Sequence, residues 1–113
     1  MVVETLNDIC FKQEHENTIT RFHCRVSADF YGFRGHFDGR PILPGVCQLK
    51  LVSEGISLLS SPPSIARVEK MKFHNLIVPD TAFIIELEPQ TGAWRYRIFG
   101  GADDYASGKI VLR

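Results

Sequence analysis

The sequence predicts an α+β fold in which a strongly curved antiparallel sheet wraps around one long helix. Segments with alternating apolar and polar residues, typical of half-buried strands, lie on both sides of a single helical segment. That segment, residues 46–59, is apolar around most of its helical circumference. A helix of this kind is buried on nearly all sides. In a chain of 113 residues, only a sheet folded around the helix can bury it to that extent.

The composition is that of one folded domain, which we expect to span residues 1–113. Apolar residues make up 44% of the chain, and 13 basic residues balance 13 acidic ones. The zero net charge argues against binding to nucleic acid or to a membrane surface, because both favour a basic excess. No apolar run is long enough to span a membrane and the N-terminus lacks a signal sequence, so we expect a cytoplasmic protein.

The cysteines do not suggest a metal site. There are three of them, Cys10, Cys24 and Cys47, which is an odd number without the spacing of metal ligands. We expect small buried thiols in a reducing compartment and no bound metal.

Before the helix, the chain is predicted to form two strands and a long loop. Residues 1–8 show little pattern and are expected to be a poorly fixed end, while residues 9–16 are predicted as the first strand. Residues 18–26 alternate clearly and are predicted as a half-buried second strand. Residues 27–44 form a loop of a length that is often functional in compact domains.

The most constrained stretch is residues 35–46, GHFDGRPILPGV, which contain three glycines and two prolines. Glycine allows unusual backbone conformations and proline fixes φ, so this loop is expected to hold a defined shape. Pro44 and Gly45 suit the start of the helix. The free N–H groups of the first helical turn then point back toward the loop that carries His36.

Polar residues of the predicted helix gather on one narrow strip, which must face a cavity, an interface or solvent at the open edge of the sheet. They are Lys50, Ser53, Glu54 and Ser57. After the helix, the sequence SSPPS of residues 60–64 is predicted as a turn. Four further strands are predicted at residues 65–76, 82–88, 93–99 and 105–112. The short turn sequences between them suit antiparallel hairpins.

Residues 35–46 resemble the loop–helix motif of the 3-hydroxyacyl-[acyl-carrier-protein] dehydratases, the FabA/FabZ-like family of the hotdog fold. Residues 73–80, FHNLIVPD, resemble the strand and turn that follow in the same family, and residues 94–96 fall where the family has its next hairpin. The resemblance covers nearly the whole chain. Fold alone does not fix function, so the individual site residues decide what the resemblance implies.

The family resemblance implies a homodimer in which two sheets join into one and the two active sites lie at the interface. The implied reaction removes water from a (3R)-hydroxyacyl thioester and gives a trans-2-enoyl thioester. The acyl chain would be carried by acyl carrier protein or coenzyme A, and no metal or redox cofactor would take part.

Residue by residue, the resemblance makes His36 the base that acts at the α-carbon. The Gly45 N–H matches the donor that faces the thioester oxygen. These two roles are chemically consistent, because imidazole titrates near neutrality and a developing oxyanion is stabilised by N–H groups at a helix start. Phe37, Pro44 and Val46 are expected to contact the substrate.

The sequence departs from the family at its second catalytic group. The family's helix carboxylate falls at Lys50, and Glu54 stands one turn further, where the family commonly has glutamine. Three interpretations follow: Glu54 acts as the acid, Lys50 donates the proton as an ammonium of depressed pKa, or the site no longer dehydrates. In the last case the chain is an acyl-binding protein or a partner subunit that pairs in a heterodimer with a complete homologue.

Two structural or functional alternatives also remain open for these helix residues. Lys50 and Glu54 can form a purely structural ion pair, since residues four apart on a helix are neighbours. Alternatively, Glu54 can hold a water molecule for thioester hydrolysis on the same fold.

Overall fold

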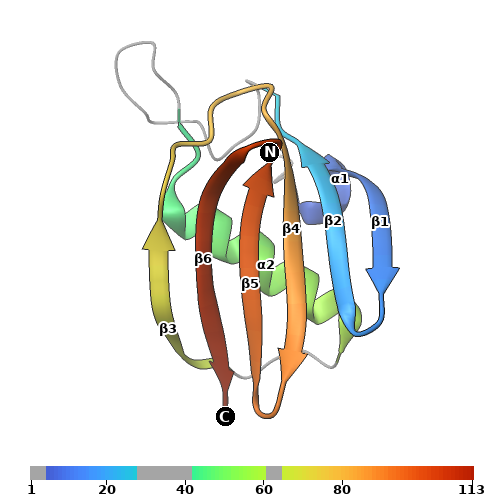
Figure 1. Cartoon of the computed structure of the whole chain (residues 1–113), viewed down its shortest axis with the longest axis vertical. Coiled ribbons are helices and arrows are strands. Elements are labelled where there is room, and N and C mark those ends of the chain that lie inside the picture. The colour runs from blue at the N-terminus through green and yellow to red at the C-terminus, as the bar shows by residue number, and fades with distance from the viewer. Residues whose placement is uncertain (1–4, 28–41, 61–64) are drawn as a thin grey trace.

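The computed structural model describes residues 5–27, 42–60 and 65–113, which form one sheet with a long helix on one face (Figure 1). The elements are α1 (Leu6–Ile9), β1 (Cys10–Glu16), β2 (Ile19–Arg25), α2 (Gly45–Leu59), β3 (Ile65–Phe73), β4 (Ala82–Gln90), β5 (Ala93–Gly100) and β6 (Asp103–Leu112). The six strands lie in the order β1-β2-β4-β5-β6-β3, and every neighbouring pair is antiparallel. The predicted α+β architecture is confirmed.

The core lies between α2 and the face of the sheet that the alternation predicted. Figure 1 shows α2 crossing that face from the β3 side to the β2 side. Phe22, Ile85 and Ile98 point from neighbouring strands into this core and are at most 1% exposed. The 15-residue α2 contributes Leu51 and Ile56, both fully buried. Within the described part of the chain, no helix is long and apolar enough to cross a membrane.

The prediction that α2 is buried nearly all round is wrong at its two ends. Val46 in the first turn is 74% exposed, and Leu58 in the last turn is 50% exposed. The sheet covers the middle of the helix but not its termini. The start and the end of α2 therefore remain accessible in this chain.

The prediction of a poorly fixed N-terminal end is also wrong for residues 6–8. These residues belong to α1, whose Leu6 is 1% exposed and whose Ile9 is 8% exposed. A capping box starts this helix, because the Asp8 carboxylate accepts a hydrogen bond of 2.6 Å from the Thr5 N–H. Four residues are too few to show a helical period, but the Thr-x-x-Asp pattern was readable in the sequence. The first strand accordingly begins at Cys10 rather than at residue 9.

The remaining boundaries agree with the prediction within two residues, apart from the end of β3. This strand stops at Phe73, whereas the prediction continued it to residue 76. The His74 N–H donates a hydrogen bond of 2.8 Å to the Tyr105 carbonyl, after which the chain leaves the sheet. Asn17, predicted as a turn, connects β1 and β2 in the left-handed region with φ of 57°.

Candidate active site

The start of α2 is the part of the predicted site that the structure describes best. Pro44 is the residue before the helix, and its carbonyl accepts hydrogen bonds of 3.1 Å from the N–H groups of both Cys47 and Gln48. The N–H groups of Gly45 and Val46 precede these and have no acceptor within the helix. They carry the positive end of the helix dipole, which suits an oxygen that develops negative charge.

Gly45 lies where the helix start meets the end of β3. A Cβ atom at this position would lie 2.5 Å from Cζ of Phe73 and 2.9 Å from its Cε1. Real side chains do not approach so closely, so glycine allows the helix start to contact the ring. Phe73 is itself 50% exposed, which leaves an aromatic surface beside Gly45. The sequence identified Gly45 but not this contact, because the two residues are far apart in the chain.

Gln48 fixes the chain that enters the helix, a role that sequence reasoning missed. Its Nε2 donates a hydrogen bond of 3.1 Å to the Leu43 carbonyl, and the Leu43 N–H donates one of 2.8 Å to the Ile77 carbonyl. Gln48 is only 4% exposed, and its Oε1 has no partner. A glutamine in the apolar stretch of the helix was the available signal. These bonds tie the helix start to the segment that follows β3.

The other predicted contact residues are placed only in part. His36 and Phe37 lie outside the described residues, so their roles as base and substrate contact remain predictions. Pro44 is half-buried and Val46 is exposed, and both flank Gly45 at the accessible helix start. These three consecutive residues, Pro44, Gly45 and Val46, therefore form the accessible start of α2.

Lys50 places a positive charge near the helix start. It is exposed and lies five residues beyond Gly45, about 7.5 Å along the helix axis. Burial raises the pKa of the Cys47 thiol, and the charge of Lys50 acts in the opposite direction. The residue that the resemblance assigns to the family's carboxylate thus carries an ammonium group near the first two turns of α2.

Glu54 is directed toward α1 of its own chain. Its Oε2 accepts a hydrogen bond of 3.2 Å from the Leu6 N–H, the first N–H of that short helix. It lies nine residues beyond Gly45, about 13.5 Å along the axis. Its Oε1 is buried and has no partner. The described contacts give Glu54 a structural role at the α1 terminus.

Most of the predicted polar strip faces a cavity, one of the three surroundings that the sequence left open for it. A hollow of about 310 Å³ is lined by the last turns of α2 and the start of α1. It is lined by Thr5, Leu6, Asn7, Ser53, Glu54, Ser57 and Leu58. The two ends of the strip therefore differ, since Glu54 lies against α1 whereas Lys50 lies exposed nearer the helix start.

We expect the structural role of Glu54 to appear in stability. Glu54→Ala removes the acceptor of the Leu6 N–H and is expected to lower the free energy of unfolding by about 1–2 kcal/mol. Glu54→Gln keeps an oxygen acceptor and is expected to cost less than about 1 kcal/mol. Urea unfolding of the two variants measures the difference. Equal stability of both variants and the parent chain would show that this hydrogen bond contributes nothing.

The three cysteines are free thiols, and the predicted burial is confirmed for Cys24, whereas Cys10 and Cys47 are only half-buried. Burial raises the pKa of the Cys24 thiol far above its ordinary value, with a smaller effect of the neighbouring Cys10. A buried thiol of raised pKa is a poor nucleophile. Cys24 is thus a core residue, whereas Cys47 lies on α2 two residues after Gly45.

Comparison with known proteins identifies the family. The model of the ApeI-like family, described as ApeI dehydratase, matches residues 12–109. The 3-hydroxyacyl-[acyl-carrier-protein] dehydratase FabZ of Moorella thermoacetica is 28% identical over 100 residues, which cover 77% of this chain and 70% of the relative. FabZ of Ralstonia nicotianae is 24% identical over 94 residues, which cover 71% of this chain and 57% of the relative. This chain therefore spans little more than half the length of the Ralstonia protein.

Solved structures with the same fold include further dehydratases. The dehydratase heterocomplex ApeI:P from Xenorhabdus doucetiae matches with a TM-score of 0.84 and 24% identity, over 92% of this chain and 96% of that one. The dehydratase domain of PpsC from Mycobacterium tuberculosis matches with a TM-score of 0.76 and 11% identity, over 96% of this chain and 44% of that one. These likenesses confirm the α+β hotdog fold. With the family model matched over residues 12–109, the chain belongs to the ApeI-like dehydratase family, as the resemblance to FabZ-like enzymes predicted.

Proposed function

We propose that this protein removes water from (3R)-hydroxyacyl thioesters, carried by acyl carrier protein or coenzyme A, to give trans-2-enoyl thioesters. The observation that carries the proposal is the start of α2, where Gly45 packs against the Phe73 ring and follows the loop that contains His36. Membership of a dehydratase family and similarity to FabZ proteins support it. The three free thiols fit a reducing compartment, so we place the protein in the cytoplasm.

In the proposed reaction, the His36 imidazole takes a proton from the α-carbon of the substrate. The electron pair moves toward the thioester carbonyl, whose oxygen gains negative charge that the Gly45 N–H stabilises. The bond between the β-carbon and its hydroxyl oxygen then breaks as the double bond forms. The departing hydroxide takes a proton and leaves as water. The α-proton and the hydroxide together make one water molecule and no electrons are gained or lost, so this sequence requires no redox cofactor.

Protonation of the departing hydroxide is the step for which this chain has the weakest catalytic group. The position of the family's carboxylate holds Lys50, and Glu54 lies against α1. We infer that the Lys50 ammonium gives a proton to the departing hydroxide and regains one from solvent. An ordinary lysine, with a pKa of about 10.4, is a much weaker general acid than a carboxylic acid. Loss of a general acid lowers a rate by about 10²–10⁴. The chain alone is therefore expected to be a slow dehydratase.

The same observations favour a second candidate function, that of a partner subunit. A complete homologue paired with this chain would supply the missing carboxylate across the interface. The ApeI:P assembly from Xenorhabdus doucetiae is itself a dehydratase heterocomplex. Under this alternative, the mixed dimer is the active species and the isolated chain is not.

The proposed surface for either kind of dimer is the edge strand β3. This strand pairs with β6 on one side only and exposes Val68, Met71 and Phe73. A row of unpaired backbone groups flanked by apolar side chains is a template for pairing with another strand. A second β3 at this edge would place another chain beside Phe73 and Gly45, where the proposed site lies.

We expect Val68→Asp to weaken the dimer. A buried unpaired carboxylate at a strand–strand interface is costly, so the dissociation constant is expected to rise at least about tenfold. Phe11→Asp is the matched control, since Phe11 is 65% exposed on the opposite edge strand β1. Analytical ultracentrifugation measures the dissociation constant of the dimer for both variants. If Phe11→Asp weakens the dimer and Val68→Asp does not, the interface lies at β1 and the proposed interface at β3 is wrong.

The proposed activity is tested by hydration of a crotonyl thioester, the reverse reaction, followed as loss of enoyl absorbance. Hydration is expected with the purified protein and is expected to fall by about 10²–10⁴ in His36→Ala. Release of free thiol without hydration would instead indicate a thioesterase. If the folded protein hydrates the thioester no faster than His36→Ala does, the proposal that the chain is an enzyme on its own is wrong. Activity that appears on adding a complete homologue would support the proposal that the chain is a partner subunit.

A further inference from the structure

Two of the three cysteines face each other across the first two strands. Cys10 of β1 and Cys24 of β2 are directly paired in the antiparallel register. Facing residues of antiparallel strands have Cα atoms about 4.5–5.5 Å apart, and their side chains lie on the same face of the sheet. This separation lies within the range of about 4.4–6.8 Å that disulfides require. The backbone therefore holds these two cysteines in positions that a disulfide can bridge.

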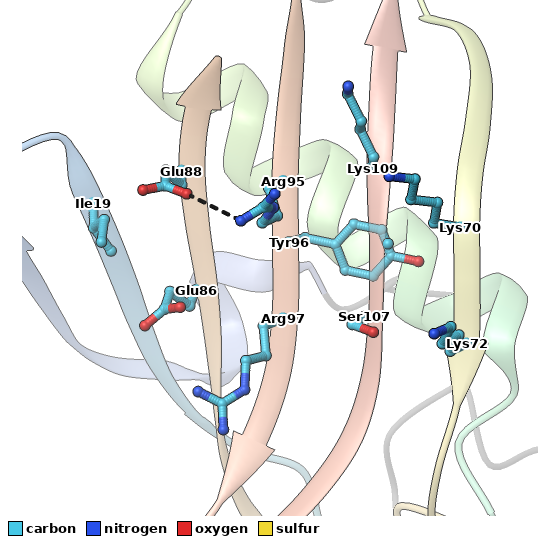
Figure 2. Close-up of a pocket in the computed structure, with 11 residues that line it drawn as sticks. Ile19, Lys70, Lys72, Glu86, Glu88, Arg95, Tyr96, Arg97, Ser107 and Lys109 are labelled. Carbon is cyan, nitrogen blue, oxygen red and sulfur yellow. Dashed lines mark ion pairs between the residues drawn. The ribbon is translucent and has the colours of Figure 1, made fainter.

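Both thiols lie on the face of the sheet that α2 covers. Figure 2 shows the opposite, outer face, where Glu86 of β4 and Arg97 of β5 line a hollow of about 540 Å³. Cys24 instead pairs with Phe83 of β4, whose side chain is 2% exposed in the core. Cys24 is fully buried in that core, and Cys10 packs against the core from the edge strand and is half-buried. A small oxidant from solvent therefore reaches Cys10 before Cys24.

The two thiols also interact with each other. Burial raises the pKa of the Cys24 thiol, and the charge of Cys10 and a hydrogen bond with it raise that pKa further. A hydrogen bond between the two groups means that their sulfur atoms are in contact. The raised pKa keeps Cys24 protonated, so it is a poor first nucleophile. It is nevertheless placed to react with the Cys10 sulfur once that sulfur has been oxidised.

The pair lies where regular strand pairing is interrupted. β1 is an edge strand that pairs with β2 on one side only, and its register shifts between Cys10 and Lys12. Such an irregularity breaks the ladder of backbone hydrogen bonds. Cys10 also follows the end of α1, whose other end is held by the Glu54 carboxylate through the Leu6 N–H. A covalent bond from Cys10 to β2 would therefore fix the second end of α1 against the core.

The third cysteine provides an internal comparison. Cys47 is half-buried, as Cys10 is, and lies in the first turn of α2. That turn contacts Phe73 of β3, the edge strand opposite to β1. Because the other two cysteines pair with each other, Cys47 has no thiol opposite to it. Exposure alone would make Cys10 and Cys47 react alike, whereas a facing thiol directs only Cys10 to an intramolecular bond.

We propose that Cys10 and Cys24 form a redox-sensitive pair, which hydrogen peroxide converts into a disulfide that fixes α1 and β1 to β2. In a reducing compartment both thiols stay free, as they are in this structure. A rise in peroxide forms the bond, and a thiol reductant such as glutathione reverses it by thiol–disulfide exchange. The pair lies away from the helix start that carries the proposed dehydration, so the inference does not depend on that function.

The oxidation takes place in two steps. The Cys10 thiolate attacks one oxygen of hydrogen peroxide, the O–O bond breaks, and Cys10 becomes a sulfenic acid as hydroxide leaves. The Cys24 sulfur gives up its proton and attacks the Cys10 sulfur, and the S–O bond breaks as a second hydroxide leaves. The two thiol protons and the two hydroxides make two water molecules. Two sulfur atoms are thereby oxidised to the disulfide and one peroxide molecule is reduced.

The test treats the folded, reduced full chain with hydrogen peroxide, blocks the remaining thiols with iodoacetamide and analyses a tryptic digest by mass spectrometry. Trypsin places Cys10, Cys24 and Cys47 in the separate peptides 1–12, 22–25 and 35–50. The expected product is peptide 1–12 joined to peptide 22–25, from a chain that remains a monomer on non-reducing electrophoresis. Dithiothreitol is expected to separate the two peptides. Links to peptide 35–50, links only between chains, or no link at all would overturn the proposed pair.

Three variants test the assigned order of reaction. Cys10→Ser is expected to lose the link and to leave the buried Cys24 reduced. Cys24→Ala removes the second thiol, so oxidation is expected to stop at a Cys10 sulfenic acid that dimedone labels. Cys47→Ser is the matched control and is expected to form the link at the parent rate. Oxidation of Cys24 at the parent rate in Cys10→Ser, or no dimedone label in folded Cys24→Ala, would contradict the proposed order.

Stability measures what the bond does to the fold. The disulfide closes the loop of residues 10–24 and is expected to raise the urea concentration at the unfolding midpoint by about 1–3 M. The comparison is made between reduced and oxidised Cys47→Ser after the peroxide is removed. An unchanged midpoint in the linked protein would show that the bond does not fix α1 and β1.

Hydration of a crotonyl thioester by the same two samples separates this inference from the proposed activity. The reduced and the oxidised form are expected to hydrate it equally fast, because β1 lies at the edge of the sheet opposite to β3 and the helix start. A large loss of hydration on oxidation would contradict the separation of the pair from the site. Absence of hydration in both forms, with the link formed, would contradict the proposed function alone.

Discussion

Replacing Lys50 by glutamate is expected to raise the rate of crotonyl thioester hydration by about 10²-fold or more, the usual contribution of a positioned general acid or base. The residue lies exposed on the second turn of α2, at the position that the resemblance assigns to the family's carboxylate. A glutamate there would exchange a proton with the hydroxyl oxygen as the bond to the β-carbon forms or breaks. The helix backbone needs no adjustment, because glutamate and lysine have similar helix propensities.

Two controls separate proton transfer from charge. Lys50→Gln removes the ammonium without adding a carboxylate, and Lys12→Glu makes the same charge reversal on β1, where the side chain is 58% exposed. Only Lys50→Glu is expected to gain activity. A similar gain in Lys50→Gln would mean that the ammonium inhibits the reaction. No gain in Lys50→Glu, with the fold retained and hydration measurable, would show that position 50 does not reach the substrate.

Replacing Leu51 by alanine is expected to lower the free energy of unfolding by about 2–5 kcal/mol. Leu51 is fully buried in the middle of α2, where the sheet covers the helix. The loss combines the transfer free energy of the removed atoms with the cavity that remains. For a domain of this size such a loss is a large part of the total stability, which is about 5–15 kcal/mol.

Leu58→Ala on the same helix is the matched control. This side chain is 50% exposed in the last turn, so its truncation is expected to cost less than about 1 kcal/mol. Chemical unfolding of both variants gives the comparison. Equal losses would contradict the observed position of α2, in which the middle is enclosed and the end is not.

The parts of the fold that the sequence predicted are those with strong local patterns. In β2 and β4 the alternation of apolar residues matches the buried face, and Pro44–Gly45 marks the start of α2. The exposed ends of α2 could not be predicted, because the extent of the sheet over a helix is set by tertiary packing. In α1, four residues are too few for a period, and the capping pattern of Thr5 and Asp8 was the only local signal.

The candidate site was predictable where the chemistry is local and not where it depends on distant contacts. Gly45 was identified from the loop–helix motif, but its contact with Phe73 joins α2 to the end of β3. Glu54 was expected near the reaction, whereas in the structure its carboxylate accepts a hydrogen bond from the Leu6 N–H, 48 residues away in the sequence. The facing position of Cys10 and Cys24 likewise depends on the register of β1 against β2.

Hydration of a crotonyl thioester in D₂O, with the product analysed by mass spectrometry, tests the proposed dehydratase activity most directly. If His36 exchanges a proton with the α-carbon, the 3-hydroxybutyryl product carries deuterium at that carbon. It is expected to form at least about 10²-fold faster with the parent chain than with His36→Ala. Consumption of the thioester by release of free thiol, or no deuterated product above the level of a folded His36→Ala variant, would contradict the proposed function.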